Sequence, residues 1–381
     1  MLFLNNEDVA RLLTVEDALH ALEEGHRDLA AQRLVSRPRI DIYTETDAAD
    51  RLHRWGTMEG SSKSLRRLAI RVKSDIVSWP TVAGRVREEK YCLRPGLYCG
   101  LVLLFDTESG QPLAIINDGL LQHVRVGALA ALGDKYLAKP NASCVGMIGS
   151  GGMARSHLEA FAAVRPIKRA KVYSPNAENR ERYAREMGDR TGIDVIPCES
   201  AVEAVAGVDV VATCTSSEQA TVFASMLEPG MHLTKVAREW APDVLPMIDV
   251  SIGGDASSQV VQGKGVDDSM GFPTYLAGSH DALRAAKGAH RHRRRRGDVG
   301  SANSESAFSG RVVPLAELIA GSVPGRASSE EISSSGGVLG GPSGKQGLQF
   351  VTVGSLVYDR ANAAGVGRRV PTEWFLQDIR D

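Results

Sequence analysis

The stretch CVGMIGSGGMA, residues Cys144–Ala154, decides the fold. It predicts a short apolar strand, a glycine-rich turn and the start of a helix, with Gly149, Gly151 and Ala154 at the small positions of a GxGxxG/A dinucleotide fingerprint. These positions permit a tight turn, approach of the backbone to a pyrophosphate, and close packing of helix on strand. The helix N-terminus then offers N–H groups to phosphates. The stretch predicts a site for NAD or NADP lined by Gly149, Ser150, Gly151, Gly152, Met153 and Ala154.

The composition is that of a globular protein large enough for two domains: 381 residues, 43% hydrophobic and 24% charged. The formal net charge of −1 gives no reason to expect nucleic acid or an anionic membrane as a partner. Five scattered cysteines without CxxC or Cys/His spacing predict no disulfide, no metal site and a cytoplasmic location. No apolar run approaches the about 18 residues of a membrane span, and the N-terminus lacks the basic segment of a signal peptide.

Strands and helices alternate after the fingerprint turn. Strand-like runs occupy residues 169–175, 193–198, 209–216, 231–236 and 247–254, and helical segments separate the first three. This alternation predicts a parallel, doubly wound sheet, which makes residues 121–315 a Rossmann-like nucleotide-binding domain.

The segments on either side of this domain show a different pattern of predicted secondary structure. Residues 6–33 predict two helices, the second beginning with a capping box at Thr14 and Asp17. Short runs between residues 37 and 105 predict sequential antiparallel strands, and a long helix follows to Ala138. Helical spacing after Phe350 predicts a C-terminal helix that returns to the N-terminal segment. Residues 1–120 and 316–381 are therefore expected to form a second, α+β domain.

Two segments are predicted as loops, residues 288–310 and residues 327–347, because both are rich in Ser, Gly and other polar residues. The first contains the run HRHRRRR, His290–Arg296, which could recruit RNA or an acidic partner. Its Gly, Asp and Ser neighbours favour a solvated loop instead, so nucleic acid is not the expected partner.

The choice between NAD and NADP depends on the end of the second strand. NAD-selective folds place an acidic residue there to hold the ribose 2′-hydroxyl, and this chain has none. Ser174, Asn176 and Arg180 could accommodate a 2′-phosphate, which favours NADP; a loop that accepts both cofactors is the alternative. The strand at 209–216 ends in small hydroxyl residues, at the sheet edge where cofactors lie in such folds. Thr213, Thr215 and Ser216 are therefore further candidates for cofactor binding. An ordinary strand-to-loop cap explains each of the three equally well.

Four segments in this order resemble the ornithine cyclodeaminase/mu-crystallin family: NNEDVARLL, PLAIINDGLLQHVRVGALAALGDKYLA, GSGGMA and DVVATCTS. The resemblance covers residues 1–250 and, more loosely, 312–381. It implies a substrate-binding and dimerisation domain built from both ends of the chain, with the nucleotide domain between them. The implied partners are a small amino or imino acid and a second copy of the chain.

The resemblance also implies which cations hold the substrate carboxylate. Arg125 matches the family's arginine at the helix start, where a guanidinium can grip a carboxylate at two points. Lys73 matches the lysine with which the family contacts its substrate from a strand. The alternative is that Arg71, Lys73 and Asp75 share a solvent-exposed face of the strand, in which case simple alternation explains the lysine. Arg39 matches an early arginine, although Arg37 is close enough to take its place.

The acid/base position departs from the family pattern. Glu239 falls where the family carries an aspartate, and Asp243 is the competing candidate, although it could be a helix-start acid. We expect Lys73 and Glu239 to be catalytic, while His123 is expected to be a packed or capping residue.

The resulting expectation is an NAD(P)-dependent oxidoreductase that acts on the C–N bond of a small amino or imino acid. The alternatives are an ornithine cyclodeaminase with internally recycled cofactor and a crystallin-like protein that binds NADPH with little turnover. The sequence does not distinguish reduction from oxidation or cyclodeamination, and it does not identify the substrate.

Overall fold

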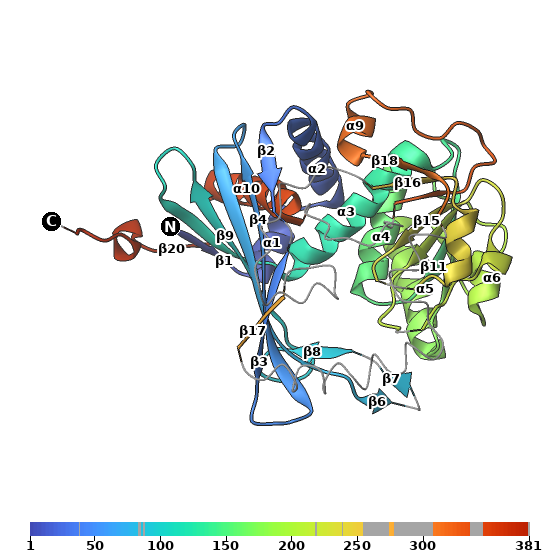
Figure 1. Ribbon diagram of the computed structural model, residues 1–381, viewed down its shortest axis with the longest axis horizontal. Coiled ribbons are helices and arrows are strands. Elements are labelled where there is room, and N and C mark those ends of the chain that lie inside the picture. Colours follow the sequence, from blue (N-terminus) through green and yellow to red (C-terminus); the bar gives the residue numbers. More distant parts are fainter. Residues whose placement is uncertain are drawn as a thin grey trace.

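The structure, a computed structural model, contains two large sheets joined by a central helix, and a separate two-stranded sheet (Figure 1). It describes residues 1–37, 39–82, 85–86, 88–217, 219–237, 239–253, 274–277, 308–335 and 346–379. The basic run at 290–296 lies outside these residues.

The first sheet is built mainly from the N-terminal part of the chain, with β17 and β20 added from later residues at its two ends, in the order β17-β3-β4-β5-β9-β10-β1-β20. Its central strands are sequential and antiparallel, as predicted. The bounds are β1 Leu2–Leu4, β3 Ile40–Glu45, β4 Arg51–Ser62, β5 Arg67–Ser78, β9 Cys99–Asp106, β10 Pro112–Asn117, β17 Thr274–Ala277 and β20 Arg368–Arg369. Beside them, β2 (Leu34–Ser36) pairs with β4, β8 (Glu89–Tyr91) pairs with β5, and β6 (Thr81–Val82) pairs with β7 (Arg85–Val86).

Helices cover one face of this sheet. The long helix α10 (Gln346–Ala364) packs on β4, β5 and β9, and α1 (Asn6–Leu12) and α2 (Val15–Ala30) contact α10. Both N-terminal helices begin with capping boxes, at Asn5 and at Thr14. The C-terminal helix α10 thus returns to the first sheet, as the sequence predicts. Alternate residues of β4 and β5 are buried, as expected for strands with one face covered.

The second sheet is parallel throughout, in the order β13-β12-β11-β14-β15-β19-β16-β18. This confirms the predicted Rossmann-like, doubly wound architecture. The strands are β11 Cys144–Ile148, β12 Arg169–Tyr173, β13 Asp194–Pro197, β14 Val210–Thr213, β15 His232–Lys235, β16 Val250–Ile252, β18 Arg311–Val313 and β19 Ser333–Ser334. The helices are α4 Gly152–Val164, α5 Ala177–Thr191, α6 Ala201–Val205 and α9 Leu315–Ile319, with short 3-10 turns at Ala224–Met226 and Pro242–Met247. A further 3-10 turn, Thr372–Phe375, follows β20 and contacts β10 of the first sheet.

One helix connects the two sheets. Helix α3 (Gly119–Leu137) packs on α4 on one side and on α2 on the other. It begins directly after β10 and lies between the two large sheets (Figure 1). The start of α3 lies beside the start of α4, because a Cβ built on Gly152 would be 2.9 Å from the ring of His123. No helix among the described residues has the length and apolarity needed to span a membrane.

The expected loop over residues 327–347 is wrong at Ser333 and Ser334. These two residues form β19, which lies between β15 and β16 and is completely buried. Their hydroxyls are satisfied internally: Ser333 donates to Leu137 O at 2.9 Å, and Ser334 contacts Ser251 Oγ at 2.7 Å. The second sheet therefore takes a strand from beyond residue 315, where the sequence places the end of the nucleotide-binding domain.

Candidate active site

The glycine-rich turn has a backbone that only glycine adopts easily. Gly149 follows β11 with φ +115°, and its N–H donates to Tyr173 O at 2.8 Å. A Cβ placed on Gly149 would lie 2.3 Å from Cys214 O. The first position of the fingerprint is thus a tight turn against the neighbouring strand end.

The next glycine leaves open space instead. Gly151 is the N-cap of α4 and provides no side-chain cap, and a Cβ built on it would meet no described atom within 4 Å. The third small residue, Ala154, is fully buried, and its carbonyl accepts a hydrogen bond from the Tyr183 hydroxyl at 3.0 Å. The positive end of the helix dipole and the free space at Gly151 together suit the binding of a pyrophosphate group at the N-terminus of α4.

The end of β12 is held by its own side chains. Ser150 Oγ donates to Ser174 Oγ at 3.0 Å, and Asn176 caps α5 by accepting from Asn179 N at 2.9 Å. Arg180 is buried, donates to Glu199 at 2.5 Å and donates to Ser174 O at 3.3 Å. Its guanidinium is therefore already engaged with a carboxylate.

The end of β14 lies beside the turn, because Thr213 pairs with Ile148 in the parallel register. Thr213 is buried and donates to Thr234 O at 3.3 Å. Thr215 is half-buried and Ser216 is exposed. These last two residues therefore reach the carboxyl edge of the sheet, where cofactors lie in open α/β folds.

Glu239 joins the ends of two parallel strands. Its buried carboxylate accepts hydrogen bonds from Thr215 N at 3.1 Å and Ala237 N at 2.7 Å. Burial raises the pKa of Glu239, although these two N–H groups oppose the shift. Asp243 lies further on, in the first turn of the 3-10 helix Pro242–Met247. Among the described contacts, the carboxylate of Glu239 does not reach the cations of the first sheet.

A buried charged face lies on the first sheet. Arg71, Lys73 and Asp75 alternate along β5, and all three are buried, which excludes the solvent-exposed alternative. Lys73 Nζ lies 3.2 Å from Asp75 Oδ2. Burial lowers the pKa of Lys73 well below its usual value, and the charges of Arg54 and Arg39 lower it further.

Glycine makes room for these groups on the neighbouring strand. Gly56 of β4 is opposite Lys73, and a Cβ on it would lie 2.5 Å from Asp41 Oδ1 and 2.7 Å from Lys73 Cε. Arg39 binds Asp41 at two points, both 2.7 Å. Arg39 thus has an internal carboxylate partner, whereas Arg37 pairs separately with Glu59.

Arg125 lies in the first turns of α3 and is buried, and it forms no ion pair with a carboxylate among the described residues. It donates to Gln349 Oε1 at 2.5 Å and to Gln122 Oε1 at 2.7 Å, and its guanidinium lies 4.8 Å from the Phe350 ring centroid. Burial and the nearby charge of Arg71 lower its pKa to about 9, so Arg125 remains charged at neutral pH. A buried cation held by neutral amides is a favourable place for an anion.

Several residues complete this cluster without any signal in the sequence. Arg71 donates to Asp118 Oδ2 at 2.6 Å and stacks 5.5 Å from the same Phe350 ring. Gln349 and Phe350 are on α10, more than 200 residues from Arg125. The sequence predicts that this helix returns to the first domain, but no spacing rule links its side chains to the arginines.

His123 lies between this cluster and the dinucleotide turn. A Cβ on Gly152 would be 2.9 Å from its ring, which places the half-buried imidazole against the first residue of α4. Burial lowers the pKa of His123, so it is largely neutral at pH 7. The structure therefore brings Arg39, Lys73 and Arg125 together near α3 and leaves Glu239 with the nucleotide-side strands.

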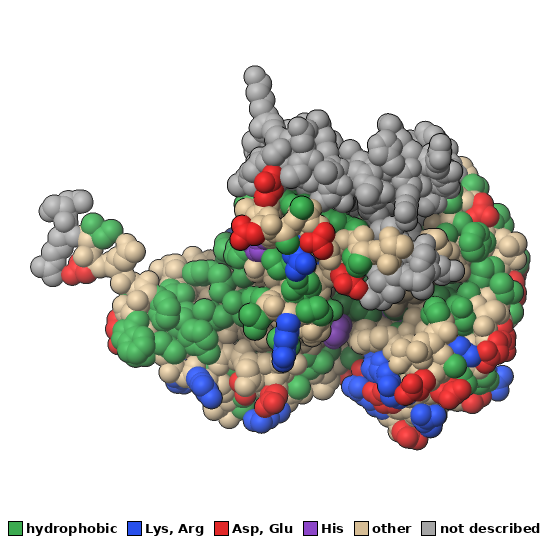
Figure 2. Space-filling model, turned by 90° about the horizontal axis from the view of Figure 1, so that it is seen from below, with side chains coloured by type: hydrophobic (Ala, Val, Ile, Leu, Met, Phe, Trp, Pro, Cys, Tyr) green, Lys and Arg blue, Asp and Glu red, His purple; other side chains and the backbone are tan. Residues whose placement is uncertain are grey.

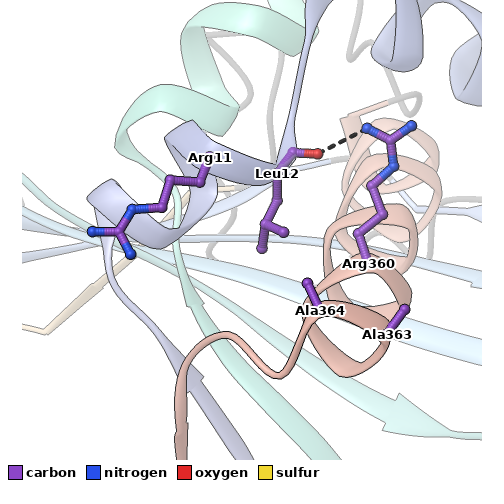
Figure 3. Close-up of a pocket in the computed structure, with 5 residues that line it drawn as sticks. All are labelled: Arg11, Leu12, Arg360, Ala363 and Ala364. Carbon is purple, nitrogen blue, oxygen red and sulfur yellow. Dashed lines mark hydrogen bonds between the residues drawn. The ribbon is translucent and has the colours of Figure 1, made fainter.

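A separate surface pocket contains none of these residues. It lies between α1 and α10 and is lined by Arg11, Leu12, Arg360, Ala363 and Ala364 (Figure 3). Arg360 donates to Leu12 O at 2.9 Å across it. Because no candidate catalytic or cofactor residue lines this pocket, it is not the site described above.

Comparisons with known proteins identify close parallels. Residues 95–245 match the model of the ornithine cyclodeaminase/mu-crystallin family. A delta(1)-pyrroline-2-carboxylate reductase of Bacillus cereus is 28% identical over 71% of this chain and 74% of its own. The ketimine reductase mu-crystallin of Rattus norvegicus is 32% identical over 35% of this chain and 42% of its own.

Solved structures share the fold across nearly the whole chain. The delta(1)-pyrroline-2-carboxylate reductase of Thermococcus litoralis, solved with NADH and L-proline, has a TM-score of 0.69 at 22% identity and covers 97% of this chain and 100% of its own. Over residues 95–245 the chain is therefore similar to the ornithine cyclodeaminase/mu-crystallin family, and the fingerprint turn and the buried Arg125 ahead of it both lie within that stretch.

Proposed function

We propose that this protein is an NAD(P)-dependent oxidoreductase that reduces the C=N bond of a small α-imino acid, or oxidises the corresponding amino acid. The observation that carries the proposal is Arg125, a buried guanidinium that, among the described residues, forms hydrogen bonds with two glutamines and no ion pair with a carboxylate. It lies in the first turns of α3, close to the start of α4. The reductases among its relatives and structural neighbours support the same reaction class.

The residues of the turn fit a dinucleotide. Gly149 provides the tight bend, Gly151 the open approach and the α4 N-terminus the N–H groups, while Ser150 and Ser174 lie at the end of β12. When bound, the nicotinamide supplies or accepts the hydride. We propose that NAD(H) is accepted, because Arg180 is paired with Glu199 rather than open to a 2′-phosphate. Three structural neighbours were solved with NAD+, NADH or NAD.

The cationic side chains near the first sheet have separate roles in this proposal. Arg125 binds the substrate carboxylate, because its planar guanidinium makes two-point contacts. Lys73 faces the same cluster and holds a proton close to the substrate nitrogen, and its lowered pKa makes it a stronger proton donor than an ordinary lysine. Arg39 acts through Lys73, since Asp41 already binds its guanidinium.

We assign Glu239 a positioning role rather than an acid/base role, because Thr215 N and Ala237 N occupy its carboxylate. This favours imino-acid reduction over cyclodeamination, in which a free carboxylate would have to handle the substrate amine.

The proposal is tested by following nicotinamide absorbance while the protein is offered NADH or NADPH with a panel of cyclic and acyclic imino acids. Ornithine is assayed in parallel for ammonia and proline. Imine-dependent oxidation of the reduced cofactor supports the proposal. Proline formation from ornithine, or cofactor binding without turnover of any imino acid, would replace it with cyclodeaminase or with a binding protein.

We further propose a homodimer formed through the uncovered face of the first sheet. Aliphatic side chains of β5, β9 and β10 are half-exposed there: Ile70, Val72, Leu101, Leu103 and Ile115. Hydrophobic side chains gather at the end from which the C-terminal segment extends, and charged ones at the opposite end (Figure 2). A second copy would cover this apolar surface. A cytoplasmic location is part of the proposal, because the structure shows all five cysteines unpaired.

A further inference from the structure

Two cysteines lie at the base of a loop beside the charged cluster. Strands β8 and β9 pair with the same edge of β5, because β4 occupies the other edge along its whole length. Tyr91 at the end of β8 is opposite Ile76, and Cys99 at the start of β9 is opposite Ser74. Cys92, the residue after Tyr91, is therefore next to Cys99 along this edge, and residues 93–98 form a loop that leaves and returns there.

The loop is tightly closed on itself. Cys92 N donates to Leu97 O at 2.8 Å, and Arg94 N donates to Cys92 O at 2.8 Å. Leu93 between them has φ +68°, a left-handed conformation that is unfavourable for a leucine, and 87% of its surface is exposed. This backbone strain is retained at a position that contributes little to the core.

The two thiols interact directly. The pKa of Cys99 is raised first by burial and then by the charge of Cys92 and a hydrogen bond with it. Both side chains are half-buried rather than enclosed, unlike Cys198 and Cys214. The carboxylates of Asp118 and Asp75 also act on Cys99, which locates the pair at the border of the substrate cluster.

We propose that Cys92 and Cys99 form a modification site: a dithiol that a low-molecular-weight disulfide such as oxidised glutathione converts to an intramolecular disulfide. The Cys92 thiolate attacks one sulfur of the reagent, the reagent's S–S bond breaks, and one glutathione leaves as a thiol. The Cys99 thiolate then attacks Cys92 Sγ and the second glutathione leaves. Two protein thiols are oxidised and one small disulfide is reduced to two thiols. Because Cys99 reacts with its neighbour Cys92 and not with the reagent, its burial does not prevent the second step.

The disulfide would act on substrate binding, and this part of the inference rests on the proposed function. Ser74, opposite Cys99, lies between Lys73 and Asp75, and a Cβ on the next residue, Gly100, would clash with the Asp118 carboxylate at 2.0 Å. Locking the loop base therefore constrains the strand positions that hold Lys73 and Asp118. The dinucleotide turn is on the other sheet, so cofactor affinity should not change.

The test treats the full-length protein with oxidised glutathione, alkylates the remaining thiols with iodoacetamide and digests with trypsin. Pro95 follows Arg94, so trypsin leaves both cysteines in the peptide 91–125. We expect this peptide to be lighter by two hydrogen atoms and free of alkyl groups. Cys99→Ser should instead retain glutathione on Cys92, and Cys92→Ser should react far more slowly. Cys198→Ser is the control and should behave as the wild type.

The proposal is overturned if both thiols of the wild type stay alkylatable, or if glutathione remains attached without a disulfide. For the functional part, KM for the imino acid should rise several-fold on oxidation, with the Kd for NADH unchanged and reversal by dithiothreitol. An unchanged KM in protein with the disulfide overturns the coupling to substrate binding. Because the disulfide is read by mass, it is tested even if no imino acid is turned over.

Discussion

In the proposed site, Arg125 is the residue on which we expect substrate binding to depend most. We predict that Arg125→Lys lowers kcat/KM for the imino acid by about 100-fold, since the charged two-point contact contributes about 3 kcal/mol and an ammonium group cannot reproduce it. The Kd for NADH should stay as in the wild type. Arg11→Lys, on the exposed face of α1, is the matched control. Equal values of kcat/KM for the Arg125 variant and the wild type would place the substrate carboxylate elsewhere.

Lys73 should set one limb of the pH profile. Its pKa is lowered by burial and by Arg54 and Arg39, so it loses its proton well below the usual lysine range. If the protonated form is required, kcat/KM falls as pH rises through this lowered value and is constant below it. Lys73→Arg, which keeps its charge, should move this limb to higher pH at a reduced rate. A limb that stays in place in the variant would assign it to another group.

The glycine turn allows folding and cofactor binding to be separated. Gly149→Ala should lower the free energy of unfolding by about 1–3 kcal/mol, because a side chain at φ +115° is strained and its Cβ meets Cys214 O. Gly151→Ala should melt like the wild type, since its Cβ meets no described atom, and should weaken NADH binding at least about tenfold by filling the phosphate approach. Thermal melting and NADH titration measure the two effects. Normal NADH affinity in Gly151→Ala would show that the pyrophosphate does not pass this turn.

The helices and strands that the sequence predicts correctly are those with a strong local sequence pattern. The fingerprint strand and helix, the capping box at Thr14 and the antiparallel strands all follow local rules, and the structure contains each of them. Strand β19 has no such pattern. It is two serines long, and its buried hydroxyls form hydrogen bonds with Leu137 O and Ser251 Oγ, which are distant in sequence.

The candidate site shows the same limit. The alternation of Arg71, Lys73 and Asp75 is equally typical of a solvated strand, whereas in the structure this face is buried. The internal pairing of Arg39 with Asp41, and of Glu239 with two backbone N–H groups, depends on three-dimensional neighbours. Sequence patterns therefore identify charged candidates, whereas the structure shows which charges are already satisfied.

At the scale of the whole molecule, the apolar face of the first sheet leads to a prediction about assembly. The protein should sediment at twice the mass of the chain, and Leu103→Lys should shift it to the monomer because a charge would be buried at the centre of the interface. Val202→Lys, at a 62% exposed position on α6, is the control and should remain dimeric. A monomeric wild type would contradict the proposal.

The bond between Arg125 and Gln349 has a consequence for the order of events during synthesis. The two residues are 224 positions apart, and α10 is the last long helix of the described chain. A nascent polypeptide can form the dinucleotide turn long before the ribosome supplies Phe350, so cofactor affinity should arise first and substrate affinity only near completion of translation. A chain that ends before residue 346 would bind the nucleotide but would lack Gln349 and Phe350, which contact the buried arginines. Such an incomplete chain would therefore show no catalytic activity.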